Sequence, residues 1–555
     1  MVDFFATHQE RLERAVEASR SRGYWSPHPE QPSGRIYGET AKADAAAAFQ
    51  ALRGRTFELD QPADGGLVGK EVSPWGPALD IRYPAAEVET LVAAARAAMP
   101  GWADAAPDCR AGIAVEILQR LNALSFLMAE AVMHTTGQAF PMAFQAGGPH
   151  AQDRGLEAVA YAWDEMRRVP ARARWEKPQG KAAPLLLEKE YRLVPRGVAL
   201  VIGCATFPTW NSYPGLFASL VTGNAVIVKP HPMAILPLAL TVRIGREVLA
   251  EAGFDPNLLL LAADEPEAPI TKELALHPEI RLIDFTGSPA FGHWLRSNAR
   301  ADRVYTEEAG VNPVVIDGTD DFAGMCRNLA FSLSLYSGQM CTAPQNIFVP
   351  MGGIATDEGP KSFEEVADGI ARAIDRLLED PERAAAVLGA IQSEATLARV
   401  REMRGEAPVI RDSAPLPGEA FAEARTATPL LLRAEAGDTA LYFEERFGPI
   451  AFLVRTEDTA RSLELAARSA RARGAITAAV YATDAGVLAQ AADAFAHAGV
   501  ALACNLTGGA FVNQSAAFSD YHVSGANPAG TACLTDTAFV ADRFRIVSVR
   551  RPLAA

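Results

Sequence analysis

Short, uninterrupted apolar runs separated by stretches with helical spacing constrain the fold of this chain more than any other feature. Residues 198–202 read VALVI and residues 225–229 read AVIVK, and the mixed segment 281–285 (RLIDF) is a further predicted strand. Such runs are typical of strands covered on both faces, and the intervening segments 211–222 and 237–252 have the length and spacing of helices. This alternation predicts an α/β fold with a doubly wound parallel sheet.

A second region repeats the pattern. Residues 313–316 and 346–349 are apolar runs on either side of the helical segment 322–336, which predicts a second α/β domain. The chain has 555 residues, of which 49% are hydrophobic, enough for several cores. Further helices are predicted at 8–18, 40–52, 87–98, 109–134 and 156–166.

Two segments alternate polar and apolar residues. Residues 188–195 (EKEYRLVP) have the pattern of an edge strand. The tail 544–551 (FRIVSVRR) adds a strand either to another subunit or to an edge within the same chain, and the pattern does not choose between these two.

The composition excludes several classes of protein. The formal net charge of −15 argues against a nucleic-acid or anionic membrane surface as the main partner. No apolar stretch approaches the roughly 18–20 residues of a membrane span, and the first 25 residues lack the pattern of a secretory signal. The six cysteines include no CxxC pair, which indicates a reducing compartment, and the nine histidines form no HExxH motif. We therefore expect a cytoplasmic protein without a metal site.

Cys341, which ends the segment 338–341 (GQMC), is the candidate nucleophile. A cysteine attacks as its thiolate, and partial exposure at a helix N-terminus lowers its pKa. Glu307, in the upstream segment 307–313 (EEAGVNP), can act as general base on a thiol or on a hydrolytic water. Each residue alone is a weak signal, because most cysteines are small buried hydrophobes and most glutamates lie on the surface.

An ordered set of seven motifs gives these two residues a context. In chain order they are Phe207-Pro208, Gly223-Asn224 with 227–230 (IVKP), 285–288 (FTGS), Glu307, 338–341 (GQMC), 445–449 (ERFGP) and Ser524-Gly525. From about residue 60 onward the chain thereby resembles the aldehyde dehydrogenase superfamily. The resemblance implies an N-terminal helical extension, a Rossmann-type nicotinamide cofactor domain, an α/β catalytic domain and a small β oligomerisation element. The corresponding ranges are 1–60 for the extension, 61–165 with 192–308 for the cofactor domain, 309–530 for the catalytic domain, and 166–191 with 531–555 for the oligomerisation element.

The resemblance also implies the catalytic roles. Cys341 would attack an aldehyde to give a thiohemiacetal, which loses a hydride and becomes a thioester, and Glu307 would activate the water that hydrolyses it. The family usually has Asn before the Phe-Pro pair, where it completes the oxyanion hole, but this chain has Thr206. A lost donor of this kind costs on the order of 10²–10³ in rate. The hydroxyl of Thr206, the amide of Asn211 and the backbone N–H of Cys341 stay open as replacements.

The cofactor roles follow in the same way. Lys229 would hold the adenosine ribose, and Glu445 would hold the nicotinamide ribose with Phe447 packed nearby. Gly287 and Ser288 would begin a helix whose free N–H groups face the pyrophosphate.

The cofactor prediction turns on a second departure from the family pattern. Many NAD-preferring members have Glu three residues after the lysine, whereas this chain has Pro232. This change removes a carboxylate that would repel the 2′-phosphate of NADP, and the neighbouring His231 could approach that phosphate. We therefore predict NADP as the preferred cofactor, with NAD as the alternative.

The divergent motifs are similar to one branch of the superfamily. Segments 204–208 (CATFP), 306–313 (TEEAGVNP), 521–525 (YHVSG) and 24–27 (YWSP) resemble the PaaN branch, which is named for bacterial phenylacetate degradation. This resemblance implies a ring-opened, coenzyme A-linked semialdehyde as substrate, a separate hydratase as a pathway partner, and a homodimer or homotetramer. Two alternatives stay open: a dehydrogenase for a free aromatic or aliphatic aldehyde, and a catalytically weak scaffold that binds acyl-CoA.

Overall fold

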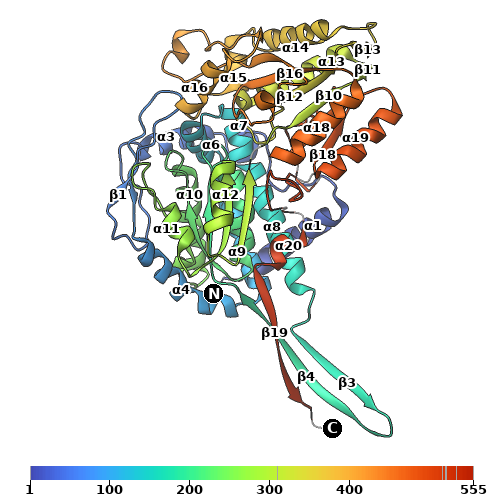
Figure 1. The fold of residues 1–555 in the computed structure, drawn as a ribbon. Helices are drawn as coiled ribbons and strands as arrows, with labels where there is room; N and C mark the ends of the chain where they lie inside the picture. The colour runs from blue at the N-terminus through green and yellow to red at the C-terminus, as the bar shows by residue number, and fades with distance from the viewer. Residues whose placement is uncertain are drawn as a thin grey trace.

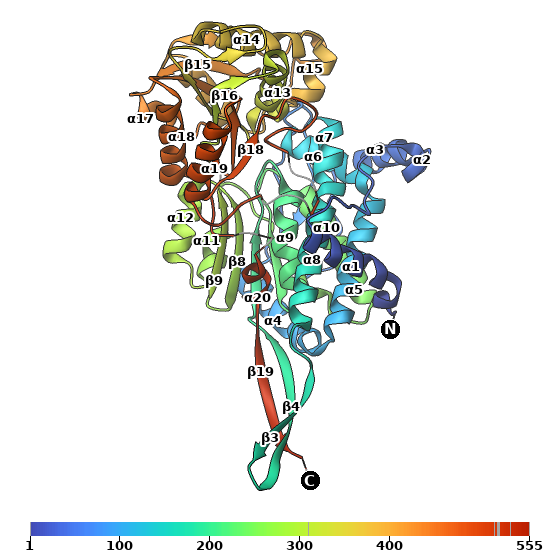
Figure 2. The same cartoon turned by 90° about the vertical axis from the view of Figure 1, so that its right-hand side faces the viewer.

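The computed structural model describes residues 2–308, 310–514, 517–518, 522–532, 534 and 536–553. Ala309 and Tyr521, which occur in the motifs above, lie outside these residues. The chain forms two α/β bodies that stack on each other, and a three-stranded sheet projects from one of them (Figures 1 and 2). The predicted α/β class is confirmed.

The first body is built on a five-stranded parallel sheet in the order β7-β6-β5-β8-β9. Its strands are β5 (Val198–Ile202), β6 (Ala225–Lys229), β7 (Leu259–Leu261), β8 (Ile280–Gly287) and β9 (Arg303–Glu308), and the crossovers include α9 (Pro208–Val221), α10 (Leu236–Glu251), α11 (Thr271–Leu276) and α12 (Pro289–Asn298). The sheet grows from β5 in one direction through β6 and in the other through β8. The carboxyl ends of β5 and β8 therefore form a topological switch point, where open α/β sheets bind ligands.

Helices of the N-terminal third cover this sheet. They are α4 (Val88–Asp104), α5 (Pro107–Ala123), α6 (Ser125–Thr136), α7 (Phe140–Gly147) and α8 (Pro149–Arg167). The prediction of one continuous helix over 109–134 is wrong, because the chain breaks at Leu124 and the two helices meet at 74°. Both are largely buried, and periodicity alone does not mark a break within a continuously apolar stretch.

Within the described part of the chain, no single helix has the length and apolar composition of a membrane span. The bent pair α5–α6 passes that test only when its two helices are taken together.

Residues 2–84 precede these helices in the chain, and two of their helices pack on them. Helix α1 (Phe4–Ser21) lies against α5 and α8, and α3 (Ala41–Leu52) lies against α6. The short helix α2 (Gly34–Tyr37) precedes α3, and the small pair β1 (Leu67–Val68) and β2 (Tyr83–Pro84) follows it.

The second body contains a seven-stranded sheet in the order β14-β15-β16-β12-β10-β17-β18, in which only the β14–β15 pair is antiparallel. The strands are β10 (Pro313–Ile316), β12 (Asn346–Pro350), β14 (Val409–Arg411), β15 (Leu430–Glu435), β16 (Ile450–Thr456), β17 (Thr477–Tyr481) and β18 (Ala501–Cys504). Helices α13 (Phe322–Ser334), α14 (Phe363–Leu377), α15 (Pro381–Leu388), α16 (Glu394–Met403), α17 (Thr439–Tyr442), α18 (Thr459–Arg473) and α19 (Ala485–Ala498) surround it, with the short pair β11 (Gly318–Thr319) and β13 (Ala355–Thr356) at its margin.

The projecting sheet is antiparallel, in the order β19-β4-β3. Its strands are β3 (Arg172–Gln179), β4 (Ala182–Pro195) and β19 (Phe544–Pro552). The prediction that 188–195 is an edge strand is wrong, because β4 lies in the centre and pairs on both sides. Its alternating pattern reflects two half-exposed faces rather than an unpaired edge. The tail pairs with β4 of its own chain, and the outer edge of β19 has no strand partner among the described residues.

Candidate active site

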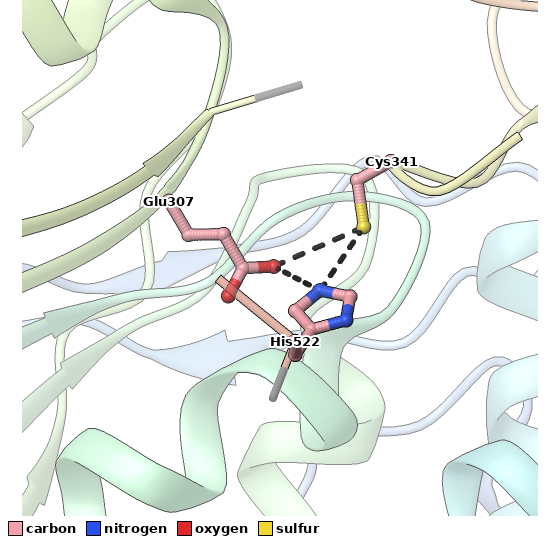
Figure 3. A group of neighbouring side chains, drawn as sticks. All are labelled: Glu307, Cys341 and His522. Atoms are coloured by element: carbon pink, nitrogen blue, oxygen red, sulfur yellow. Dashed lines mark hydrogen bonds and ion pairs between the residues drawn. The ribbon is translucent and has the colours of Figure 1, made fainter. Parts of the chain in front are cut away.

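Cys341, Glu307 and His522 meet where the two bodies face each other (Figure 3). The Cys341 Sγ lies 3.8 Å from Glu307 Oε1 and 3.5 Å from His522 Nε2. His522 Nε2 is 2.9 Å from Glu307 Oε1, and the side chains of His522 and Glu307 are only 6% and 13% exposed. The structure thus brings the predicted nucleophile close to the predicted carboxylate, and it adds an imidazole.

Two different elements position the predicted pair. Glu307 lies near the carboxyl end of β9, at the edge of the first sheet that faces the second body. Cys341 lies in a turn between the 3₁₀ helix η2 (Leu335–Gly338) and β12. Tyr336 and Ser337 of η2 have left-handed φ angles of 50° and 49°, and the Ser337 hydroxyl donates to two backbone carbonyls at 3.0 Å. Strain of this kind persists only where the surroundings enforce it.

Hydrogen bonds and close packing also hold the part of this loop that contains Cys341. Asn312, just before β10, donates from Nδ2 to the carbonyls of Cys341 at 2.8 Å and Ala343 at 2.9 Å. Gly338 packs so closely that an added Cβ would lie 2.5 Å from the carbonyl oxygen of Gly448, which explains glycine at this position. Cys341 therefore lies on a loop that is held by hydrogen bonds and close packing.

The electrostatics of the pair favour a neutral thiol and an ionised carboxylate. Burial, followed by the neighbouring Glu307, raises the pKa of Cys341 well above its ordinary value. The pKa of Glu307 is lowered, because its contacts with His522, together with Arg154 and Asn211, outweigh the effect of burial. Cys341 follows a 3₁₀ helix and begins no helix, so an N-terminal helix dipole does not lower its pKa.

The two oxyanion candidates with side chains are already engaged. Asn211 donates from Nδ2 to Glu307 Oε1 at 2.7 Å. The Thr206 hydroxyl faces the Cys204 sulfur at 4.0 Å and makes no hydrogen bond with Cys341. The backbone N–H of Cys341 makes no hydrogen bond with the described residues, so of the three candidates it is the donor left free.

A cavity of about 840 Å³ leads to Cys341. Met142, Phe207, Trp210, Met340 and Phe511 contribute apolar wall, and Arg154 contributes a positive charge. The Arg154 guanidinium lies 3.8 Å from the centre of the Trp210 ring, and its buried Nε has no hydrogen-bond partner among the described residues.

The N-terminal extension also lines this cavity. Tyr24, Ser26, His28 and Glu30 contribute to the wall, and His28 is held by a 2.7 Å contact between its Nδ1 and the Asp153 carboxylate.

Lys229 and His231, two of the predicted cofactor residues, lie at the carboxyl edge of the first sheet. Lys229 ends β6, is buried, and contacts the Asp264 carboxylate at 2.7 Å. His231 accepts a hydrogen bond at Nδ1 from the N–H of Met233, and burial, then Lys229, lower its pKa to about 4. His231 is therefore neutral at neutral pH.

Gly287 and Ser288 occur where β8 turns into a helix. Gly287 ends β8, and Ser288 is the N-cap of α12, whose hydroxyl accepts from the N–H of Phe291 at 3.4 Å. Glu445 and Phe447 lie in the loop before β16, and Arg399 donates to the Phe447 carbonyl at 2.6 Å. Burial raises the pKa of Glu445 to about 8, since its carboxyl makes no hydrogen bond with the described residues.

Comparison with known proteins agrees with this architecture. The family model described as "Aldehyde dehydrogenase family" matches residues 81–531. The chain belongs to the aldehyde dehydrogenase family. It is therefore an oxidoreductase that acts on aldehydes, as predicted.

Three similar proteins show how this chain compares with known dehydrogenases. An aldehyde dehydrogenase from Burkholderia multivorans, described as NAD-dependent, is 57% identical with a TM-score of 0.98, and the match covers 100% of both chains. The N-succinylglutamate 5-semialdehyde dehydrogenase of Burkholderia lata is 29% identical over 387 residues, which is 67% of this chain and 72% of that relative. An NADP-dependent glyceraldehyde-3-phosphate dehydrogenase of Bacillus halodurans C-125, solved with NADP, shares only the fold, at 21% identity and a TM-score of 0.69, with 91% of this chain and 99% of that chain covered.

Residues of both bodies fit the dinucleotide that this family implies. The Glu445 carboxyl, which makes no hydrogen bond with the described residues, suits ribose hydroxyls. At the N-terminus of α12 the backbone N–H of Ala290 makes no hydrogen bond with the described residues and suits a pyrophosphate.

Sequence reasoning missed His522, although it lies in the quoted segment 521–525. It also missed Arg154. The donor atoms of Glu307, Cys341 and His522 lie within 4.8 Å of one another, but hydrogen bonding accounts for this contact, and the absence of a metal site stays a prediction.

Proposed function

We propose that this aldehyde dehydrogenase oxidises an aldehyde to a carboxylate through a covalent intermediate on Cys341. The observation that carries the proposal is the 3.8 Å separation of Cys341 Sγ and Glu307 Oε1 at the end of a cavity large enough for an organic substrate. Assembly of these groups argues against the weak-scaffold alternative, whose only support was Thr206.

The residues divide the reaction between them. The Cys341 thiolate adds to the aldehyde carbon. A nicotinamide cofactor held by residues such as Lys229 and Glu445 would supply the hydride acceptor for the oxidation. Glu307, held as a carboxylate by Asn211 and His522, takes a proton from the water that hydrolyses the thioester. The backbone N–H of Cys341 donates to the oxyanion in both tetrahedral states.

For the cofactor, the predicted use of NAD or NADP is consistent with relatives of both kinds, and we propose NAD as the better of the two. The 57% identical relative is described as NAD-dependent. Lys229 is neutralised by Asp264, and His231 is uncharged, so neither offers a free positive charge to a 2′-phosphate. These observations outweigh the loss of a repulsive carboxylate at Pro232.

For the substrate, we propose a semialdehyde that carries a negative or strongly polar group. Arg154 supports this class, because its guanidinium lies in an otherwise largely apolar part of the wall and lacks an ion pair among the described residues. Both the predicted coenzyme A-linked semialdehyde of the PaaN branch and a dicarboxylic semialdehyde, as in the name of the 29% identical relative, meet this requirement. A free neutral aldehyde uses only the apolar wall.

The remaining assignments stay proposals. These are the functional domain ranges, the homodimer or homotetramer formed through the projecting sheet, a cytoplasmic location, and a separate hydratase if the substrate comes from ring opening.

The test is a substrate panel assayed by nicotinamide reduction, with NAD and NADP in parallel. The panel holds a coenzyme A-linked semialdehyde, succinic semialdehyde and butanal, and each is run with wild type, Cys341→Ala and Arg154→Met. We expect that oxidation requires Cys341 and that the wild type prefers the charged substrates. Arg154→Met should abolish this preference. Preference for butanal that Arg154→Met leaves unchanged would contradict the substrate class, and oxidation by Cys341→Ala would contradict the mechanism.

A further inference from the structure

His522 lies between the two groups to which the proposed mechanism assigns the chemistry. Its Nε2 is 3.5 Å from Cys341 Sγ and 2.9 Å from Glu307 Oε1, whereas the direct distance from sulfur to carboxylate is 3.8 Å (Figure 3). We propose that His522 is a catalytic residue, which takes the proton of the Cys341 thiol and so generates the attacking thiolate. This inference rests on the proposed role of Cys341 as nucleophile.

The imidazole is held in place for this role. Its ring packs against the Trp210 indole edge to face, with 4.6 Å between the ring centres. Asn211 fixes the carboxylate oxygen that His522 contacts, through its own 2.7 Å hydrogen bond. A buried ring with two such neighbours is positioned more precisely than a surface histidine.

The proton transfer balances within the three side chains. At 2.9 Å, Nε2 and Oε1 share one proton, since two bare acceptors at that distance would repel each other. When this proton moves onto Glu307, Nε2 becomes free to accept the proton from Cys341 Sγ. The products are a thiolate, a neutral imidazole whose N–H points to it, and a carboxylic acid at Glu307. Glu307 passes this proton to solvent before it acts as the base for the hydrolytic water.

This route leaves the number of buried charges unchanged. One negative charge moves from the carboxylate to the sulfur, so the site avoids the cost of adding a second unpaired charge in a buried place. The charged and titratable groups around it are Glu307 and Arg154, with Cys204 and Glu445 acting on Cys341 from further away.

The structure shows why Cys341 needs such a partner. Burial, then Glu307 and the other negative neighbours, raise the pKa of Cys341 well above the ordinary value, and η2 offers no N-terminal dipole. His522 is not among these causes, and the proposed proton transfer through it is what lowers the midpoint of thiolate formation again. An imidazole beside a cysteine is a common means of activating a thiol.

The test is the pH dependence of alkylation of Cys341 by iodoacetamide, which needs neither aldehyde nor cofactor. The full-length protein is alkylated in the presence of a chelator, so that bound metal does not mask the thiol, and the Cys341 peptide is quantified by mass spectrometry. We expect the wild-type midpoint to lie below the ordinary thiol pKa of about 8.5. In His522→Asn the midpoint rises to or above that value, and the rate at pH 7 falls at least ~10-fold.

His150→Asn is the matched control. His150 lines the same cavity but pairs with Glu30 at 2.8 Å, so this variant should keep the wild-type profile. A wild-type midpoint at or above the ordinary value would overturn the proposal, and so would a His522→Asn profile that matches wild type. If neither His522→Asn nor His522→Gln folds, the wild-type profile alone decides. A protein that alkylates as expected but oxidises no aldehyde would contradict the proposed function and leave this inference standing.

Discussion

At the scale of single residues, Thr206 tests the assignment of the oxyanion donor. Its hydroxyl faces the Cys204 sulfur rather than Cys341, whose own backbone N–H is free of hydrogen bonds with the described residues. We expect Thr206→Ala to lower kcat by less than about 10-fold, against roughly 10²–10³ for loss of a principal donor. Steady-state rates of wild type, Thr206→Ala and Thr206→Ser decide this. A 100-fold loss in the alanine variant that serine restores would make the hydroxyl the main donor.

Glu157 gives a pH-dependent prediction. Burial raises its pKa from 4.5 to about 7, although it accepts a 2.6 Å hydrogen bond from the N–H of Phe518. The native state therefore binds this proton more tightly than the unfolded state, so its contribution to stability falls as the pH rises from about 4.5 to about 7.

Glu157→Gln keeps the acceptor and removes the titration. Relative to wild type, the variant should gain stability between pH 5 and pH 8, by on the order of 3 kcal/mol. Thermal melting at the two pH values measures this difference, and a difference that does not change with pH would refute it.

Sequence predicted only part of the site. Cys341 and Glu307 stand in motifs that resemble a family, so their types and order mark them. His522 contacts them from 181 and 215 residues away, and nothing local to residue 522 distinguishes it from other histidines. Arg154 likewise occupies an ordinary helical position, and only the folded cavity shows that its guanidinium lacks an ion pair.

At the scale of elements, the sequence predicted the residue ranges of the strands that are buried on both faces. The ranges for β5 and β6 coincide with the apolar runs, because a strand buried on both faces needs an uninterrupted run. The break at Leu124 and the central place of β4 depend on what packs around them, which periodicity does not contain.

A buried ion pair attaches the C-terminal segment to the first sheet. Arg543, between α20 (Thr537–Ala541) and β19, donates to the two carboxylate oxygens of Asp284 at 2.6 and 2.7 Å. Arg543→Met leaves that carboxylate buried without its partner, and we expect a loss of about 3–5 kcal/mol. The double variant Arg543→Met with Asp284→Leu should recover part of this loss. Thermal melting of the two variants measures it, and a double variant no more stable than the single one would contradict the account.

At the scale of the whole molecule, the extension and the two bodies build one cavity. Residues 24–30, between α1 and α2, supply part of its wall, and η2 and the loop around Phe511 close it from the second body. The sequence identified residues 1–60 as an extension but did not show its role. A cavity wall formed by segments that are distant in the sequence exists only after folding.

The projecting sheet predicts assembly. The outer edge of β19 has no strand partner within the part of the chain that the structure describes, and Leu185, Val194 and Val547 on this sheet are 42–53% exposed. Edges of this kind pair with another chain unless they are protected. Light scattering after gel filtration should give a dimer or tetramer for wild type and a monomer after deletion of 544–552.

Met351→Asp is the control, since it changes an exposed apolar residue in the second body and should leave the oligomer intact. A monomeric wild type, or a truncated protein of unchanged mass, would rule out this interface.

The most direct test of the central claim is to trap the intermediate on Cys341. Glu307→Gln removes both the base that activates water and the final acceptor of the Cys341 proton. With aldehyde and NAD it should therefore release one equivalent of reduced cofactor per site, more slowly than the wild type forms its first equivalent, and then stop. The Cys341 peptide should then carry the acyl group, and Cys341→Ser should show neither effect. Continued turnover by Glu307→Gln at the wild-type rate, or an acyl group on another residue, would contradict the account.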